Sequence, residues 1–231
     1  MTATADVTDV DVAIAVAQEG AAIVRRRFGT SLRRVAKAAD DFATSADLES
    51  EAAMMAVLRR QRPGDSIRAE ESGASGPATA RRTWLIDPLC GTLNYAAGMR
   101  IVAVNVAGRD DVGCFAAAVA DPFNDELFWT DGVAAFRRTA GEDRALVKDG
   151  RSRLVDLNLD PPFPNAPAFR AVTLAADAEF SARFRPRVLS TSLALTWSRA
   201  GSGRPTSATA TCGTASTSPP GWRSAKPPAV P

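Results

Sequence analysis

The hydrophobic period changes along this chain, and that change limits its fold more than any other feature. Apolar residues recur at helical spacing in residues 9–28 and again in residues 45–61. Later apolar runs are short, several of them alternate with polar residues, and turn signals separate them, as in strands. These runs are residues 83–89, 100–108, 112–120, 125–130 and 133–138. The pattern predicts two amphipathic helices followed by strands, of which the last four form a meander.

The ends of both helices are marked. Acids open residues 9–28 and three arginines close them before Gly29, which suits the helix dipole. Thr44 or Ser45 caps the second helix, and Pro63-Gly64 ends it. Further along the chain, two segments can each form a strand or a helix, residues 151–157 and 168–176. A helix candidate, STSLALTW, lies within residues 180–197.

The last 34 residues differ in kind. Residues 198–231 contain no Leu, Ile or Phe, and no acid follows Glu179 anywhere in the chain. Such a segment buries too little apolar surface to offset the entropy lost on ordering, so we predict that it is disordered. We therefore divide the chain into a folded domain, 1–197, and a low-complexity tail, 198–231.

Composition excludes several classes of function. With no histidine, the chain has neither Ser-His-Asp catalysis nor imidazole ligands for zinc. Three cysteines imply no disulfide framework, so we expect a reducing, cytoplasmic setting. The sequence shows no signal peptide and no apolar stretch long enough to cross a membrane. Its basic residues are scattered, so we expect no nucleic-acid partner.

Three stretches place carboxylates where chemistry is available. They are Asp41-x-x-Thr44-x-x-Asp47 at a helix start, Glu70-Glu71-Ser72-Gly73 in a loop after a helix, and Asp87-Pro88-Leu89-Cys90-Gly91-Thr92 at a strand end. An acid at a strand end beside a Gly-Thr helix start offers a ligand for a hard cation and a site for an anion. Together they suit a metal-assisted phosphomonoesterase.

Each stretch also has a purely structural interpretation. Thr44 and Asp47 can simply cap a helix, Glu70-Glu71 can be solvated loop charge, and Asp87-Pro88 can be a turn. Cys90, Cys114, Trp84 and Tyr95 are residue types that most often fill a core. The ordered set of three stretches favours the functional interpretation.

This set resembles the inositol monophosphatase family of magnesium-dependent, lithium-sensitive sugar phosphatases, from the N-terminal helix to about Trp197. The most specific part is Trp84-Leu85-Ile86-Asp87-Pro88-Leu89-Cys90-Gly91-Thr92-Leu93-Asn94-Tyr95. The resemblance implies a layered α-β-α-β-α sugar-phosphatase fold, with helices 9–28 and 45–61 against a mostly antiparallel sheet and an incomplete C-terminal lobe.

The resemblance also implies roles for individual residues. Glu70 and Asp87 would be metal carboxylates for Mg²⁺, and the Leu89 carbonyl a backbone ligand. Thr92 with Asp47 would orient the attacking water, so Asp47, Thr92 and Glu70 form the expected catalytic set. The Gly91 and Thr92 N–H groups would bind phosphate. Lys37 resembles a basic residue that the family places before its Asp-x-x-Thr stretch, one residue out of register.

Two departures from the family stand out. Cys90 occupies the position of the family's next metal-binding acid, and a thiol is a poor ligand for Mg²⁺. By position, Cys90 belongs to the expected metal residues. Because its thiol replaces a carboxylate, we expect the second metal site to be impaired. The family's W-D-x-A-A-G segment, which supplies another ligand of the second metal, is also missing near the C-terminus.

The tail has two interpretations. Read one base out of frame with GC-rich codons, Ser216–Pro231 permits a segment similar to the family's Ala-Ala-Gly … Glu-Ala-Gly, which suggests a frameshift near codon 197. The alternative is a genuine low-complexity extension. Resequencing the locus distinguishes a sequencing error from a true frameshift mutation and from a genuine extension.

The leading functional hypothesis is a metal-dependent phosphomonoesterase acting on a small phosphorylated polyol such as inositol monophosphate. One alternative is an inactive family member that binds a sugar phosphate or a partner without turnover. Another is a truncated, non-functional product. The expected partner is a small phosphorylated substrate; whether the chain forms a homodimer stays open.

Overall fold

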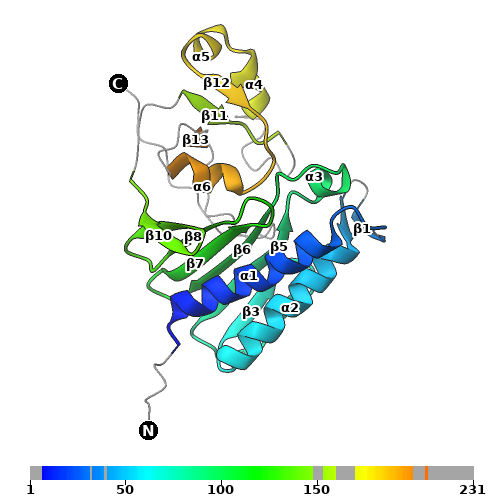
Figure 1. Ribbon diagram of the computed structural model, residues 1–231, viewed down its shortest axis with the longest axis vertical. Coiled ribbons are helices and arrows are strands. Elements are labelled where there is room, and N and C mark those ends of the chain that lie inside the picture. The colour runs from blue at the N-terminus through cyan, green and yellow to red at the C-terminus, as the bar shows by residue number, and fades with distance from the viewer. Residues whose placement is uncertain are drawn as a thin grey trace.

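The computed structural model describes residues 7–31, 33–38, 41–147, 153–159, 170–199 and 206–207. Two long helices, α1 (Asp9–Arg27) and α2 (Ser45–Gln61), lie side by side on one face of an eight-stranded sheet (Figure 1). The strands in spatial order are β10 (Glu142–Ala145), β9 (Ala135–Thr139), β8 (Glu126–Thr130), β7 (Cys114–Asp121), β6 (Ala103–Arg109), β5 (Thr83–Cys90), β3 (Ser66–Ala69) and β4 (Gly73–Ser75). Within this eight-stranded sheet only the β3–β5 pair is parallel.

Further layers lie on the other face of the sheet. Helix α6 (Leu193–Arg199) lies between the large sheet and a small one of strands β12 (Arg185–Arg187), β11 (Leu154–Asp156) and β13 (Thr206–Ser207) (Figure 1). Helices α4 (Ala171–Ala176) and α5 (Ala178–Arg183) lie beyond the small sheet. The order helix, sheet, helix, sheet, helix confirms the predicted layered α/β fold.

Two small elements lie near the start of α2. Strands β1 (Arg34–Ala38) and β2 (Asp41–Thr44) form an antiparallel hairpin that leads into the helix. Helix α3 (Thr92–Ala96) follows directly from the end of β5.

Most of the predicted elements are present. Helix α2 has the predicted bounds, and the meander β6–β7–β8–β9 is confirmed and extended by β10. Residues 168–176 contain the helix α4, and the candidate STSLALTW is confirmed as most of α6. Strand β12 occupies an earlier part of the interval 180–197, where Pro186 has no N–H for a helix. The β1–β2 hairpin and the short strands β3, β4 and β10 had not been predicted.

The predicted disorder of the tail falls mostly outside the described residues. Within the described part, α6 extends to Arg199, two residues past the expected boundary at 197. Thr206–Ser207 pair in parallel with β11, so this short piece of the tail is part of the small sheet. None of the described helices reaches the length and apolarity that crossing a bilayer requires.

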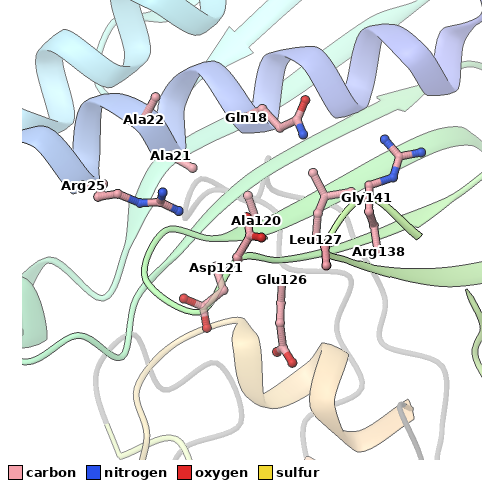
Figure 2. Close-up of a pocket in the computed structure, with 12 residues that line it drawn as sticks. Gln18, Ala21, Ala22, Arg25, Ala120, Asp121, Glu126, Leu127, Arg138 and Gly141 are labelled. Carbon is pink, nitrogen blue, oxygen red and sulfur yellow. The ribbon is translucent and has the colours of Figure 1, made fainter. Parts of the chain in front are cut away.

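A hollow of about 260 Å³ lies beside α1, where the helix leaves the ends of β7, β8 and β9 uncovered (Figure 2). Small residues of α1 and β7, among them Ala21 and Ala120, leave this space open. Two of the acids at its border face other partners: Asp121 caps the turn that follows β7, and Glu126 pairs with Arg137 on the opposite face of the sheet. The hollow contains none of the predicted site residues.

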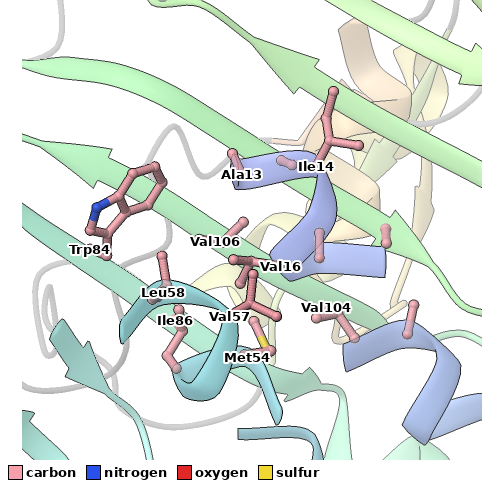
Figure 3. Close-up of a cluster of buried hydrophobic side chains, with 14 of the residues drawn as sticks. Ala13, Ile14, Val16, Met54, Val57, Leu58, Trp84, Ile86, Val104 and Val106 are labelled. Atoms are coloured by element: carbon pink, nitrogen blue, oxygen red, sulfur yellow. The ribbon is translucent and has the colours of Figure 1, made fainter. Parts of the chain in front are cut away.

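The main core lies between the helix pair and the sheet (Figure 3). Its largest fully buried side chains include Trp84, Met54 and Leu58. The Trp84 indole N–H donates to Asp65, and the Tyr95 hydroxyl donates to the Val24 carbonyl, so both aromatic residues have a core role. Cys114 is exposed, contrary to the core interpretation, because it begins β7 at the rim of a hairpin turn.

Gly20 sets the distance between α1, α2 and the sheet. A methyl group at this position would lie 2.8 Å from Met54 Sδ, 2.8 Å from Val104 Cγ1 and 2.9 Å from Ser50 Oγ. These contacts are far shorter than van der Waals packing allows, so only a residue without a side chain permits this approach.

We predict that Gly20→Val lowers the free energy of unfolding by about 1–3 kcal/mol, because the added atoms overpack a full interface. Urea denaturation measures the change. Ala15→Val, at an exposed position of the same helix, serves as the control and should cost less than about 1 kcal/mol. Equal effects of the two variants would contradict close packing at Gly20.

Candidate active site

Asp47 and Thr44 form a reciprocal cap at the start of α2. Asp47 Oδ2 accepts the Thr44 N–H at 2.8 Å and the Thr44 hydroxyl at 2.5 Å, while Thr44 Oγ1 accepts the Ala46 N–H at 3.2 Å. This capping box satisfies N–H groups that a helix start leaves without partners. The structural interpretation of Thr44 and Asp47 is therefore correct, but it accounts for only one of the two Asp47 oxygens.

The other oxygen of Asp47 connects α2 to α3. Thr92 Oγ1 lies 3.1 Å from Asp47 Oδ1 and 3.1 Å from the Leu89 carbonyl, so its single proton has two acceptors. Asp47 is only 1% exposed, and burial raises the pKa of its carboxyl, although the hydrogen bonds from Thr44 and Thr92 oppose this in part. A buried carboxylate with a raised pKa is a stronger proton acceptor than a solvated one.

An irregularity in β5 brings Asp87 and Cys90 to one face. Asp87 pairs with Asn105 of β6 and Cys90 pairs with Ala103, so β5 has one more residue than β6 between these pairs. In a regular strand, residues three apart point to opposite faces, and a bulge of one residue restores them to the same face. The bulge contains Pro88, which has no N–H to place in the ladder.

Asp87 lies among several polar groups. Its Oδ1 accepts the Leu89 N–H at 3.2 Å and its Oδ2 accepts the Asn105 side-chain amide at 3.0 Å. The Glu70 carboxyl also lies within hydrogen-bond reach. Burial raises the pKa of Asp87, and the hydrogen bonds from Glu70 and Asn105 offset part of that rise. Two carboxyl groups this close must share a proton or a cation to relieve their repulsion.

Glu51 holds the loop that carries Glu70. It is a buried residue of α2, 3% exposed, and its two carboxylate oxygens accept the N–H groups of Glu71 at 2.7 Å and Ser72 at 2.9 Å. The Glu70 N–H donates to the Ile86 carbonyl, so the loop is fixed from two sides. Sequence reasoning missed Glu51; a charged residue at a helix position that faces the core was the available signal. It also placed the Glu70 loop after a helix, whereas strand β3 precedes it.

The Cys90 thiol is held in its neutral form. Its Sγ accepts the Ser192 N–H at 3.2 Å, and the Cys90 carbonyl accepts the Thr191 hydroxyl at 3.3 Å. Burial, reinforced by the nearby charge of Asp87, raises the pKa of the thiol to about 12. A neutral sulfur that already accepts a hydrogen bond is a poor ligand for a hard cation.

Gly91 adopts the left-handed conformation, with φ 103° and ψ 41°, at the N-cap of α3. A side chain at this position would lie 3.2 Å from the Ile101 carbonyl and 3.3 Å from that of Ser190, so both the backbone angle and the space favour glycine. Lys37 lies in β1, and its side chain is outside the described residues.

The structure therefore joins the predicted residues in two contacting pairs. Asp47 contacts Thr92, and Asp87 contacts Glu70, while the Leu89 backbone touches both Asp87 and Thr92. Within the described residues, no three Cys, Asp or Glu side chains gather closely enough to hold a metal ion by themselves. A cation at Glu70 and Asp87 would need the Leu89 carbonyl and water as further oxygen ligands, which suits Mg²⁺.

Comparison with known proteins agrees with this architecture. The model of the inositol monophosphatase family matches residues 6–156. The chain belongs to the inositol monophosphatase family. It is 35% identical over 127 residues to an inositol-1-monophosphatase of Caulobacter vibrioides. The matched region covers 53% of this chain and 50% of that protein. It is 38% identical over 101 residues to the Nus factor SuhB of Pasteurella multocida, covering 42% of this chain and 36% of that one.

A solved family structure has the same fold. The extragenic suppressor protein suhB from Bartonella henselae superposes with a TM-score of 0.72 and 26% identity, over 83% of this chain and 74% of that chain. The chain spans about half the length of the curated relatives it matches. Family membership thus rests mainly on the part of the chain that contains Asp47, Glu70 and Asp87.

We predict that Glu51→Gln loosens the Glu70 loop. Glutamine offers one acceptor oxygen, so one of the N–H groups of Glu71 and Ser72 is left facing an amide donor, at a cost of about 1–3 kcal/mol. Hydrogen exchange at these two amides should accelerate at least about tenfold. Glu19→Gln, on the exposed side of α1, is the control. Unchanged exchange at residues 71 and 72 would show that Glu51 does not hold the loop.

We predict that alkylation distinguishes two cysteines of the folded chain. With a pKa of about 12, the fraction of Cys90 present as thiolate at pH 8 is on the order of one in ten thousand. Because the thiol is still far from ionised at pH 8, the rate of Cys90 alkylation should rise about tenfold per pH unit above pH 8. Exposed Cys114 should react at once. Peptide mass spectrometry after iodoacetamide treatment measures both, and the urea-unfolded chain, in which both react, is the control. Equal alkylation rates of Cys90 and Cys114 in the folded chain would show that the Cys90 thiol is neither neutral nor shielded.

Proposed function

We propose that this chain is a phosphomonoesterase that hydrolyses a small phosphorylated polyol such as inositol monophosphate, with one Mg²⁺ at Glu70, Asp87 and the Leu89 carbonyl. The observation that carries the proposal is that the Leu89 backbone contacts both the Asp87–Glu70 pair and the Asp47–Thr92 pair. Its N–H binds Asp87, and its carbonyl accepts from Thr92, which in turn contacts Asp47.

The donor set fits a hard cation. The Asp87 and Glu70 carboxyls lie within hydrogen-bond reach of each other where burial opposes charge, so a cation would relieve the repulsion between them. All the available donors are oxygen atoms, which Mg²⁺ prefers, and it commonly keeps several waters. When bound, such an ion polarises the phosphate and lowers the pKa of a coordinated water.

The contribution of the chain itself is a path for a proton. When the Thr92 hydroxyl donates to Asp47, its oxygen is free to accept a proton from a water molecule on its exposed side. The raised pKa of Asp47 makes it the acceptor at the end of this path. Thr44 fixes the other Asp47 oxygen, so the carboxylate presents one defined oxygen to Thr92. We also propose that the Gly91 and Thr92 N–H groups contact the phosphate.

A second candidate function is binding of a phosphorylated ligand or a partner without turnover. The observation in its favour is Cys90, a neutral, hydrogen-bonded thiol at the position where the family carries a metal-binding acid. Without a second cation, the leaving oxygen would have no positive charge beside it. Some relatives are named Nus factor SuhB and not as phosphatases.

Phosphate release from inositol 1-phosphate with Mg²⁺ separates the two functions. If the chain is an enzyme, the parent releases phosphate and Glu70→Gln lowers kcat by about 100-fold or more, since even outer-shell partners of a metal contribute up to about that factor. Thr92→Val should lower kcat by about 10²–10⁴-fold through loss of the proton path. Glu71→Gln, the adjacent acid, is the matched control and should leave kcat unchanged.

The opposite result would support binding without turnover. In that case the parent releases no phosphate, isothermal titration detects inositol 1-phosphate binding, and Cys90→Asp gains activity. Circular dichroism of each variant establishes that it is folded. A parent that neither hydrolyses nor binds the phosphate would reject both functions.

A further inference from the structure

The segment that precedes α6 reaches back to the candidate site. Ser192 donates its N–H to Cys90 Sγ at 3.2 Å and its hydroxyl to Asn105 Oδ1 at 2.7 Å. Asn94 of α3 donates to the Leu189 carbonyl at 2.8 Å, which fixes the start of the same segment. These contacts join residues that are some ninety to a hundred positions apart in the chain.

Asn105 links this segment to Asp87. It pairs directly opposite Asp87 in the β5–β6 ladder, and its side-chain N–H donates to Asp87 Oδ2 at 3.0 Å. Its carbonyl end faces the Ser192 hydroxyl. A reversed amide would place a carbonyl oxygen against the Asp87 carboxylate, so Asp87 selects the orientation, and the Ser192 hydroxyl holds the amide in it by donating to Oδ1.

This arrangement leaves Asp87 with defined acceptor positions. One oxygen is held by Asn105 and the other by the Leu89 N–H, so the carboxylate has no freedom to rotate. Its remaining lone pairs then point in fixed directions, and the Glu70 carboxyl lies within hydrogen-bond reach. Outer-shell partners of this kind orient metal-binding carboxylates.

We propose that Asn105, oriented by Ser192, is a positioning residue for Asp87, and that through this pair the segment before α6 sets how tightly the site binds a divalent cation. The inference rests on the proposed function for the cation at Asp87 and Glu70. It assigns a role to two neutral residues that the proposed function does not use. Ser192 acts only through Asn105.

Isothermal titration of the full chain with Mg²⁺ or Mn²⁺ tests the proposal. Asn105→Leu, which keeps the approximate shape but has no donor, should weaken cation affinity by about 10–100-fold. Ser192→Ala should weaken it by a smaller factor. The double variant should bind no more weakly than Asn105→Leu alone, because removing Ser192 has no effect once Asn105 is gone. That non-additivity is a signature that two independent structural roles would not produce.

Thr196→Ala is the matched control. It removes a hydroxyl that donates to the Leu193 carbonyl within α6 and should leave cation affinity unchanged. Thermal melts show whether each variant is folded, and Ser192→Ala tests the proposal if Asn105→Leu fails to fold.

The outcomes distinguish this inference from the function on which it rests. If the parent binds the cation, Glu70→Gln abolishes binding, and the Asn105 and Ser192 variants bind as tightly as the parent, then only the positioning role is overturned. Additive losses in the double variant also overturn the route through Asn105. If the parent binds no cation, or Glu70→Gln binds it unchanged, the proposed cation site is wrong and this inference is rejected with it.

Discussion

The buried Asp47 carboxylate is the group on which the arrangement of the candidate site depends. One of its oxygens completes the cap of α2, and the other reaches the Thr92 hydroxyl at the start of α3. A carboxylate that is 1% exposed is stable only with hydrogen bonds to both oxygens, so the two helix starts must meet here. Because Thr92 also contacts the Leu89 carbonyl, this junction sets where the end of β5 lies relative to α2.

Cys90, Asn105 and Ser192 meet where the segment before α6 reaches β5 and β6, and none of the three carries a charge. Cys90 holds a protonated sulfur, and Asn105 and Ser192 supply a neutral amide and a neutral hydroxyl. The negative charge beside them belongs to Asp87, with Glu70 within hydrogen-bond reach of it and Asp47 near enough to raise its pKa. A second divalent cation would lack a carboxylate there to offset the cost of removing it from water. This distribution of charge supports the proposal of a single cation at Asp87 and Glu70.

Residues outside the part of the chain that matches the family model complete the site. That match covers residues 6–156, whereas the contacts to Cys90 and Asn105 come from Thr191 and Ser192. The bulge in β5 makes them possible, because it turns Cys90 to the face on which Asp87 and Asn105 already lie. The proposed cation affinity thus depends on how a distant segment packs against the sheet as well as on the motif.

The sequence by itself determined the features that depend on neighbouring residues. The bounds of α2, a cap at Thr44 or Ser45, the meander of β6 to β9 and the burial of Trp84 all follow from local period and capping chemistry. Only the tertiary structure decided that Glu51 holds the Glu70 loop, that Cys114 is exposed, and that Ser192 reaches Asn105. Contacts between residues 20 to 100 positions apart depend on strand register and on a one-residue bulge. Neither can be predicted from the pattern of neighbouring residues.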